Sequence, residues 1–197
     1  MNLFGRLFRR QPEDPADQLI EWLSDKNLDD RRIVVGILYG GPYSLKVCKW
    51  VLSRPDCDKG TASMLLWNFG RPDILTKGIP GRPALQGELD RELVEFICDR
   101  WKQGLFANAI FAWDTREYSK LYRRELKKKG LQGQDPFGIP EDAWEAIIGR
   151  SPEGTPATAL SLANPLSDIL GALRLADLAA INPQEFEPLR RRSLGLD

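Results

Sequence analysis

Two carboxylates and one hydroxyl lie close together in the sequence, at Asp56, Asp58 and Thr61. Oxygen donors grouped in this way could bind a metal ion or another ligand. Two carboxylates in one desolvated pocket also push their pKa values apart, which would provide an acid and a base. Glu92 or Glu95 could join them from a helix expected later in the chain. The first chemical hypothesis is therefore an enzyme that works with carboxylates.

A structural role explains the same residues, and it is the one we favour. Pro55 disfavours helical geometry at Arg54, so a helix should end there. Asp58 could then accept hydrogen bonds from the free N–H groups that open the next helix, where its charge suits the helix dipole. Gly60 leaves room for a neighbouring backbone, and Cys57 behaves as a small buried hydrophobic residue. The segment would then be a corner between two helices, with Asp58 as the N-cap.

A second group of residues with chemical potential is basic. Residues 116–129 are expected to form a helix, and four cations fall on one face of it, namely Arg116, Lys120, Arg123 and Lys127. Such a face could bind phosphate groups, an acidic protein or RNA. The favoured alternative is a solvated helix face. Nucleic-acid binders usually carry a basic domain overall, whereas this chain has 28 Lys and Arg against 28 Asp and Glu.

The segment around Asp58 also resembles a family signature. Residues 57–62 read Cys-Asp-Lys-Gly-Thr-Ala, after an apolar helix expected over residues 45–52 and before one that carries Trp67. This is similar to the bacterial domain-of-unknown-function family 4274, whose hallmark is a Cys-Asp-x-Gly-Thr-Ala turn between such helices. The resemblance extends to residues 91–113 and so covers half of the chain at most. It implies a helical bacterial domain and no reaction.

The chain contains no histidine. This removes the usual general base near neutral pH and the commonest metal ligand. Ser-His-Asp catalysis, Cys-His catalysis and His-containing zinc sites are excluded with it. No phosphate-binding loop, dinucleotide-binding glycine pattern or Cys-x-x-Cys pair is present either. We therefore expect no cofactor and no metal, and an enzyme here would have to use carboxylates, Lys, Tyr or Cys.

Composition favours a folded cytoplasmic protein. Hydrophobic residues make up 42% of the 197 residues, and six residues are Trp, which is typical of a globular domain. Cys48, Cys57 and Cys98 are an odd number of cysteines and fit buried, reduced thiols better than a disulfide framework. No apolar run approaches the ~20 residues of a membrane helix. Residues 1–10 are weakly amphipathic and could touch a membrane surface, but a loosely docked terminus is favoured.

Apolar residues recur at helical spacing along most of the chain. We therefore expect an all-α fold of about seven or eight helices, as an irregular bundle or a short helical array. Residues 1–12 would form an N-terminal arm, residues 13–114 the region with the signature, and residues 115–197 a helical region of the same globular domain. Besides the helix after Asp58, helices are expected at residues 16–24, 33–38, 45–52, 88–101, 116–129 and 140–149, and from residue 165 to 182.

Two segments of the sequence are less regular. Residues 69–87 are rich in Gly and Pro, so we expect an irregular loop there and regard it as a candidate binding surface. Residues 109–113 could be extended or could form a helical turn. Asp114 or Thr115 could cap the helix that follows.

Three functions remain after these considerations. The favoured one is a module that binds another protein and catalyses nothing, because the usual catalytic residues are missing. The second is the carboxylate enzyme, and the third is a binder of RNA or anionic surfaces through residues 116–129. The candidate binding residues are Asp56, Asp58, Thr61, Arg116, Lys120, Arg123 and Lys127. None of them is assigned as catalytic or metal-binding, and the sequence leaves the oligomeric state open.

Overall fold

The computed structural model of the protein describes residues 14–38, 41–70, 84–131, 133, 135–154 and 165–181. These residues form seven α-helices and one 3-10 helix, and they contain no strand, so the predicted all-α fold is confirmed. The helices are α1 (Pro15–Ser24), α2 (Leu28–Ile37), α3 (Pro42–Ser53), α4 (Lys59–Phe69), α5 (Ala84–Lys102), α6 (Arg116–Lys128), the 3-10 helix η3 (Glu141–Trp144) and α8 (Pro165–Ile181).

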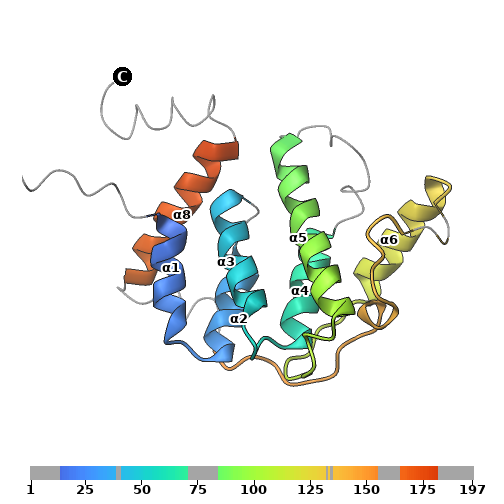
Figure 1. Ribbon diagram of the computed structural model, residues 1–197, viewed down its shortest axis with the longest axis horizontal. Helices are drawn as coiled ribbons and strands as arrows, with labels where there is room; N and C mark the ends of the chain where they lie inside the picture. Colours follow the sequence, from blue (N-terminus) through green and yellow to red (C-terminus); the bar gives the residue numbers. More distant parts are fainter. Residues whose placement is uncertain are drawn as a thin grey trace, which may run out of the picture.

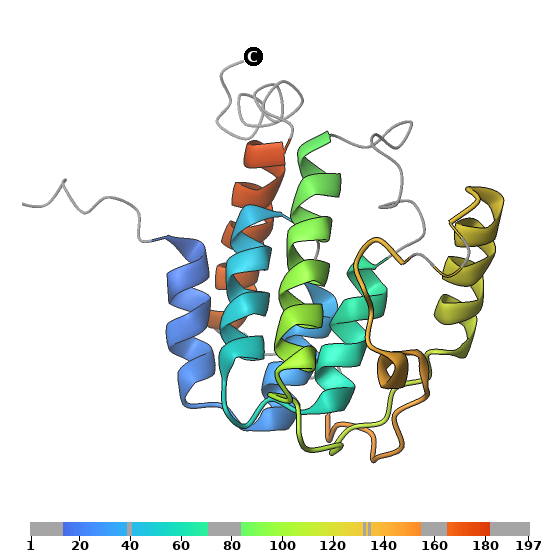
Figure 2. The same cartoon turned by 45° about the vertical axis from the view of Figure 1, so that its right-hand side comes forward.

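Helix α3 occupies the middle of the helical bundle. It packs against α1, α2, α4, α5 and α8, and α1 and α8 also pack against each other (Figure 1). Helix α6 stands at the edge of the molecule, beyond α4 and η3 (Figure 2). The arrangement therefore has a packed body and one helix that protrudes from it.

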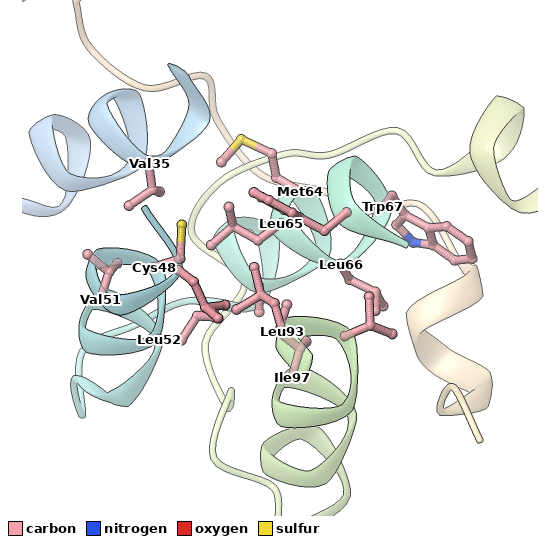
Figure 3. Packing of buried hydrophobic residues seen from close by; sticks show 14 of the residues in the cluster. Val35, Cys48, Val51, Leu52, Met64, Leu65, Leu66, Trp67, Leu93 and Ile97 are labelled. Carbon is pink, nitrogen blue, oxygen red and sulfur yellow. The ribbon is translucent and has the colours of Figure 1, made fainter. Parts of the chain in front are cut away.

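The core lies where α2, α3, α4 and α5 meet. Val35, Cys48, Leu65 and Ile97 come from these four helices in turn and point toward one another (Figure 3). Helix α4 is buried on nearly all sides, as expected for a helix without a polar face. This explains why its sequence carries almost no charge.

All three cysteines belong to this interior. Cys48, Cys57 and Cys98 are free and buried, as predicted from their apolar neighbours. Burial raises the pKa of each thiol to about 12. The thiols therefore stay protonated near neutral pH, which makes them poor nucleophiles.

The first two helices begin at side-chain caps. Asp14 precedes α1 and accepts a hydrogen bond from the backbone N–H of Ala16, and Pro15 occupies the first turn. Asn27 precedes α2 and accepts from the backbone N–H of Asp30 at 2.9 Å. The short apolar run at residues 33–38 is helical as predicted, with its last residue just beyond the end of α2.

Two predicted boundaries were wrong. Helix α5 begins at Ala84, inside the segment expected to be an irregular loop, and it includes Gly87, although Gly within a helix costs about 1 kcal/mol relative to Ala. The helix predicted at residues 140–149 is only the single 3-10 turn η3. Ile147 instead pairs with Trp113 in an isolated antiparallel bridge, and Phe111 pairs with Arg150 in a parallel one. Residues 109–113 are therefore extended.

Some predictions concern residues outside the described part of the chain. These are the N-terminal arm with its amphipathic residues 1–10, residues 71–83 of the expected loop, and the tail beyond residue 181. Among the described helices, none combines the length and apolar character needed to cross a membrane.

Helix α3 takes its N-terminal cap from a different helix. Its own N-cap residue is Gly41, which has no side chain to cap with. Asp177 of α8 replaces it, accepting hydrogen bonds from the backbone N–H groups of Tyr43 and Ser44 and from the Ser44 hydroxyl. A Cβ atom at position 41 would overlap the Asp177 carboxylate. Burial raises the pKa of Asp177, and these hydrogen bonds partly counteract it.

We expect Asp177→Ala to lower the free energy of unfolding by about 2 kcal/mol, because it leaves buried backbone donors of α3 without an acceptor. Asp168→Ala is the matched control, since Asp168 is exposed on the same helix. Urea unfolding followed by circular dichroism measures both. Equal stability of the two variants would contradict the cap.

Candidate functional site

The carboxylate of Asp58 lies at the corner between α3 and α4. One of its oxygens accepts from the backbone N–H of Thr61 at 3.0 Å, and the other from the N–H of Gly60 at 2.9 Å. The predicted N-cap is therefore confirmed. The second oxygen also accepts from the N–H of Phe111 at 2.9 Å, a residue 53 positions away. Asp58 is only 1% exposed, so it joins two distant segments inside the protein.

The extended segment at residues 108–113 runs across this corner. The carbonyl oxygen of Asn108 accepts from the backbone N–H of Lys59 at 2.7 Å. The carbonyl oxygen of Phe111 lies where a Cβ atom at Gly60 would be. Gly60 is needed for this close approach of two backbones, as expected from the sequence.

The side chain of Arg32 also contacts this extended segment. It is 5% exposed, donates to the carbonyl oxygen of Ala112 at 2.9 Å, and stacks against the rings of Phe111 and Trp113. Burial lowers the pKa of Arg32, and the nearby charge of Asp58 counteracts this. The two buried charges therefore compensate each other across the corner.

Arg150 also contacts the Phe111 ring. Its guanidinium lies 4.9 Å from the ring centroid and forms two hydrogen bonds, of 2.6 and 2.7 Å, with the carboxylate of Asp29. The hydrogen bond with Arg150 lowers the pKa of Asp29. The ring of Phe111 thus contacts two arginines, and its backbone is held by Asp58.

The other predicted members of the acidic site do not converge on Asp58. Asp56 forms an ion pair with Arg31 at 2.8 Å. The Thr61 hydroxyl accepts weakly from Arg32, at 3.4 Å. Glu92 is paired with Lys49 on the surface. Within the described residues, no three metal-binding side chains come together. We therefore interpret the corner as structural rather than chemical.

The four predicted cations of α6 are all exposed, and they do not act as one set. Arg116 binds the neighbouring Asp114 through a bidentate ion pair, which lowers the pKa of that carboxyl to about 2. Asp114 also accepts from the backbone N–H of Arg116, whereas the hydroxyl of Thr115 donates to the carbonyl of Trp144. Of the two predicted caps, Asp114 therefore provides the hydrogen bond. Arg116 is neutralised, and the free charge lies further along the helix.

An open groove of about 680 Å³ lies beside α6, between this helix and the chain leading to η3. It brings together two of the predicted residues, Arg123 and Lys127, with five others. Among the described residues, the lining consists of Arg123, Arg124, Leu126, Lys127, Gly133, Asp135 and Trp144. We call this feature the α6 groove. It is a candidate binding site in the described part of the chain.

The wall of the α6 groove is rigid because it is part of an aromatic cluster. Trp144 packs edge-on against Trp67 and Tyr122, with ring centroids 5.2 and 5.5 Å apart. The guanidinium of Arg123 lies 4.8 Å from the Trp144 ring, which holds this cation at the rim. The groove is therefore connected to the core through α4.

The one acid in the α6 groove is already engaged. The carboxylate of Asp135 accepts from the Tyr122 hydroxyl and from the backbone N–H groups of Phe137 and Ile139. Burial and this carboxylate raise the pKa of the Tyr122 phenol. Asp135 shapes the loop and does not pair with a lysine or arginine of the groove. Among the described residues, no carboxylate forms an ion pair with Arg123, Arg124 or Lys127.

Sequence reasoning missed most of the lining. Arg123 and Lys127 belong to the predicted basic face, whereas Trp144 lies in the segment 140–149 for which a helix was predicted. Gly133 and Asp135 carried no signal, because they reach the groove through a loop. Comparison with known proteins adds no further residues, since no family model, no curated protein and no solved structure matches the chain.

We predict that Asp58→Ala destabilises the protein by about 3 kcal/mol, because three buried N–H donors lose their acceptor. Asp58→Asn should destabilise the protein less, because the Asn side chain keeps one oxygen that can accept hydrogen bonds. Asn27→Ala is the matched control: it removes an exposed cap with one hydrogen bond and should cost about 1 kcal/mol. Chemical denaturation of the three variants measures this order. A loss for Asp58→Ala no larger than that for Asn27→Ala would show that Phe111 does not depend on this carboxylate.

Gly60→Ala should also be strongly destabilising, because the new methyl group would overlap the backbone of Phe111. The control is Gly87→Ala in α5, where an added Cβ meets nothing within 4 Å. That change should stabilise the protein by up to about 1 kcal/mol through helix propensity. Thermal unfolding of both variants tests the contrast, and a tolerated Gly60→Ala would refute the close approach.

Proposed function

We propose that this protein is a non-enzymatic protein-interaction module that binds an acidic segment of a partner protein in the α6 groove. The observation that carries the proposal is the free positive charge of the groove: Arg123, Arg124 and Lys127 line it, and no described carboxylate forms an ion pair with them. An acidic segment would provide the missing anions and exclude water around them.

The hydrogen bonds and ion pairs of the acidic residues argue against an enzyme. Asp58 has both oxygens occupied by backbone donors, and Asp56 is paired with Arg31. Asp135 is engaged by its own loop. A catalytic carboxylate needs a free oxygen within reach of a substrate, and neither Asp58 nor Asp135 offers one.

Charge favours a protein partner over a nucleic acid. The chain has no net charge, so no long-range field attracts a polyanion. Helix α6 itself also carries exposed Glu117 and half-buried Glu125. The groove is short and lined by three cations, Arg123, Arg124 and Lys127, which suits a few acidic side chains rather than a continuous phosphate backbone.

The setting we propose is the bacterial cytoplasm. The three buried, free thiols support a reducing compartment. The similarity of residues 57–62 to family 4274 supports a bacterial origin, and the helical corner seen at Asp58 is consistent with it.

The test is binding of a fluorescent peptide with four Asp and Glu residues to the full chain, measured by anisotropy. We expect binding that weakens as salt rises. Lys127→Glu should weaken it about tenfold, because each reversed charge at close range changes the binding energy by about 1–2 kcal/mol. The matched control is Lys26→Glu, which makes the same charge change near α1, at the opposite side of the molecule (Figure 1). Absence of binding at low salt, or an equal loss in both variants, would overturn the proposal.

A further inference from the structure

The side of α6 away from its groove carries an exposed apolar surface. Tyr118 and Leu121 are 38% and 49% exposed, and their three-residue spacing makes them neighbours on the helix. The ring of Trp113 stacks against Tyr118, with centroids 5.9 Å apart and planes inclined by 29°. We call Trp113, Tyr118 and Leu121 the apolar edge.

The apolar edge is held in a fixed position. The guanidinium of buried Arg32 lies 5.8 Å from the Trp113 ring, and the backbone of Trp113 pairs with Ile147. Trp113 therefore belongs to the segment pinned by Asp58, and Tyr118 rests on it. A surface of this kind, ordered before binding, loses little conformational entropy when a partner covers it.

The apolar edge and the α6 groove lie on nearly opposite sides of one helix. Leu121 and Arg123 are two residues apart, and a helix turns by about 100° per residue, so about 160° separates them. The outward side between them is solvated and carries the exposed cations Lys120 and Arg124 together with the exposed Glu117. No other described helix covers this side (Figures 1 and 2).

We propose that a single partner segment crosses α6 and engages both surfaces, with acidic side chains in the α6 groove and one large apolar side chain against the apolar edge. This inference rests on the proposed function, because it assigns the apolar edge to the segment that fills the groove. The two surfaces form one continuous face through Lys120 and Arg124, whose charges suit the acidic end of that segment.

Helix dimensions set the spacing of the two recognition elements. An α-helix with side chains is about 10–12 Å across, and an extended chain advances about 3.3 Å per residue. The path over the outward side covers about 160° of the helix circumference, or about 14–17 Å, so the acidic block and the apolar side chain of the partner should be separated by about four to five residues. A shorter separation would leave the apolar side chain over the cationic side of α6.

Three fluorescent peptides test this bipartite segment on the full chain. The first has only a block of four acidic residues in a Gly-Ser chain, the second adds a Leu four residues beyond the block, and the third places the Leu directly next to it. We expect the second peptide to bind roughly tenfold more tightly than the other two, as one buried Leu allows.

Variants of the protein then identify the residues responsible for the gain in affinity. The double variant Tyr118→Ser, Leu121→Ser should bind the second peptide no better than the first, while its affinity for the first stays that of the wild type. Leu175→Ser is the matched control, because Leu175 is also an exposed leucine, 56% against 49% for Leu121, on α8 at the far side of the bundle. It should keep the full preference for the second peptide.

The outcomes separate the two proposals. If the first peptide does not bind at all, the proposed function fails and this inference fails with it. If the first peptide binds and the added Leu brings no gain, or a gain independent of spacing or of Leu121, only the inference is overturned. A single-stranded RNA of ten nucleotides is the further arm, and tighter binding of this RNA than of the second peptide would overturn the assignment to a protein segment.

Discussion

The carboxylate of Asp58 connects the corner between α3 and α4 to Phe111, which lies 53 residues further along the chain. It ends the turn after α3, opens α4 through Gly60 and Thr61, and holds the backbone of Phe111. A buried carboxylate is costly unless donors surround it, and here three N–H groups do so. The corner therefore depends on one side chain whose charge is balanced by backbone donors, a helix N-terminus and Arg32 nearby.

The hydrogen bond between Asp58 and Phe111 also helps to position the α6 groove, because the chain that follows Phe111 leads directly to α6. Trp113 continues the pinned segment, and the hydroxyl of Thr115 donates to the carbonyl of Trp144 at 2.9 Å. Helix α6 begins directly afterwards, so its position relative to Trp144 is determined at both ends of this short connection. The proposed binding surface can protrude from the bundle and still be well ordered, because its base is tied to the core.

The local features of the corner could be predicted from the sequence, because they follow from residue chemistry over a few positions. Pro55 ended one helix, Asp58 capped the next, and Gly60 admitted a backbone. Phe111 as the third donor could not be predicted, since nothing in its own surroundings marks it as a partner of Asp58. The same reason applies to Asp177, which caps α3 from 133 or more residues away. The absent side chain at Gly41 was the only sign that α3 needs a cap from another part of the chain.

The basic helix shows the converse case. Its periodicity correctly predicted which cations share an exposed face, but not which of them are free. Arg116 is neutralised by Asp114, and Arg123 is held on Trp144, a contact made through a loop. Helical spacing predicts the direction in which a side chain leaves the helix. It does not predict which residues a distant loop places beside that side chain. The α6 groove could therefore not be predicted from helical spacing and became visible only in the folded structure.

The most direct test of the account is amide hydrogen exchange at Phe111, measured residue by residue under native conditions. If Asp58 holds this segment, the Phe111 amide should exchange as slowly as the amides inside α4, and Asp58→Ala should accelerate it far more than the amides of α1. A Phe111 amide that exchanges at the rate of an unprotected loop in the wild type would contradict the central role of Asp58.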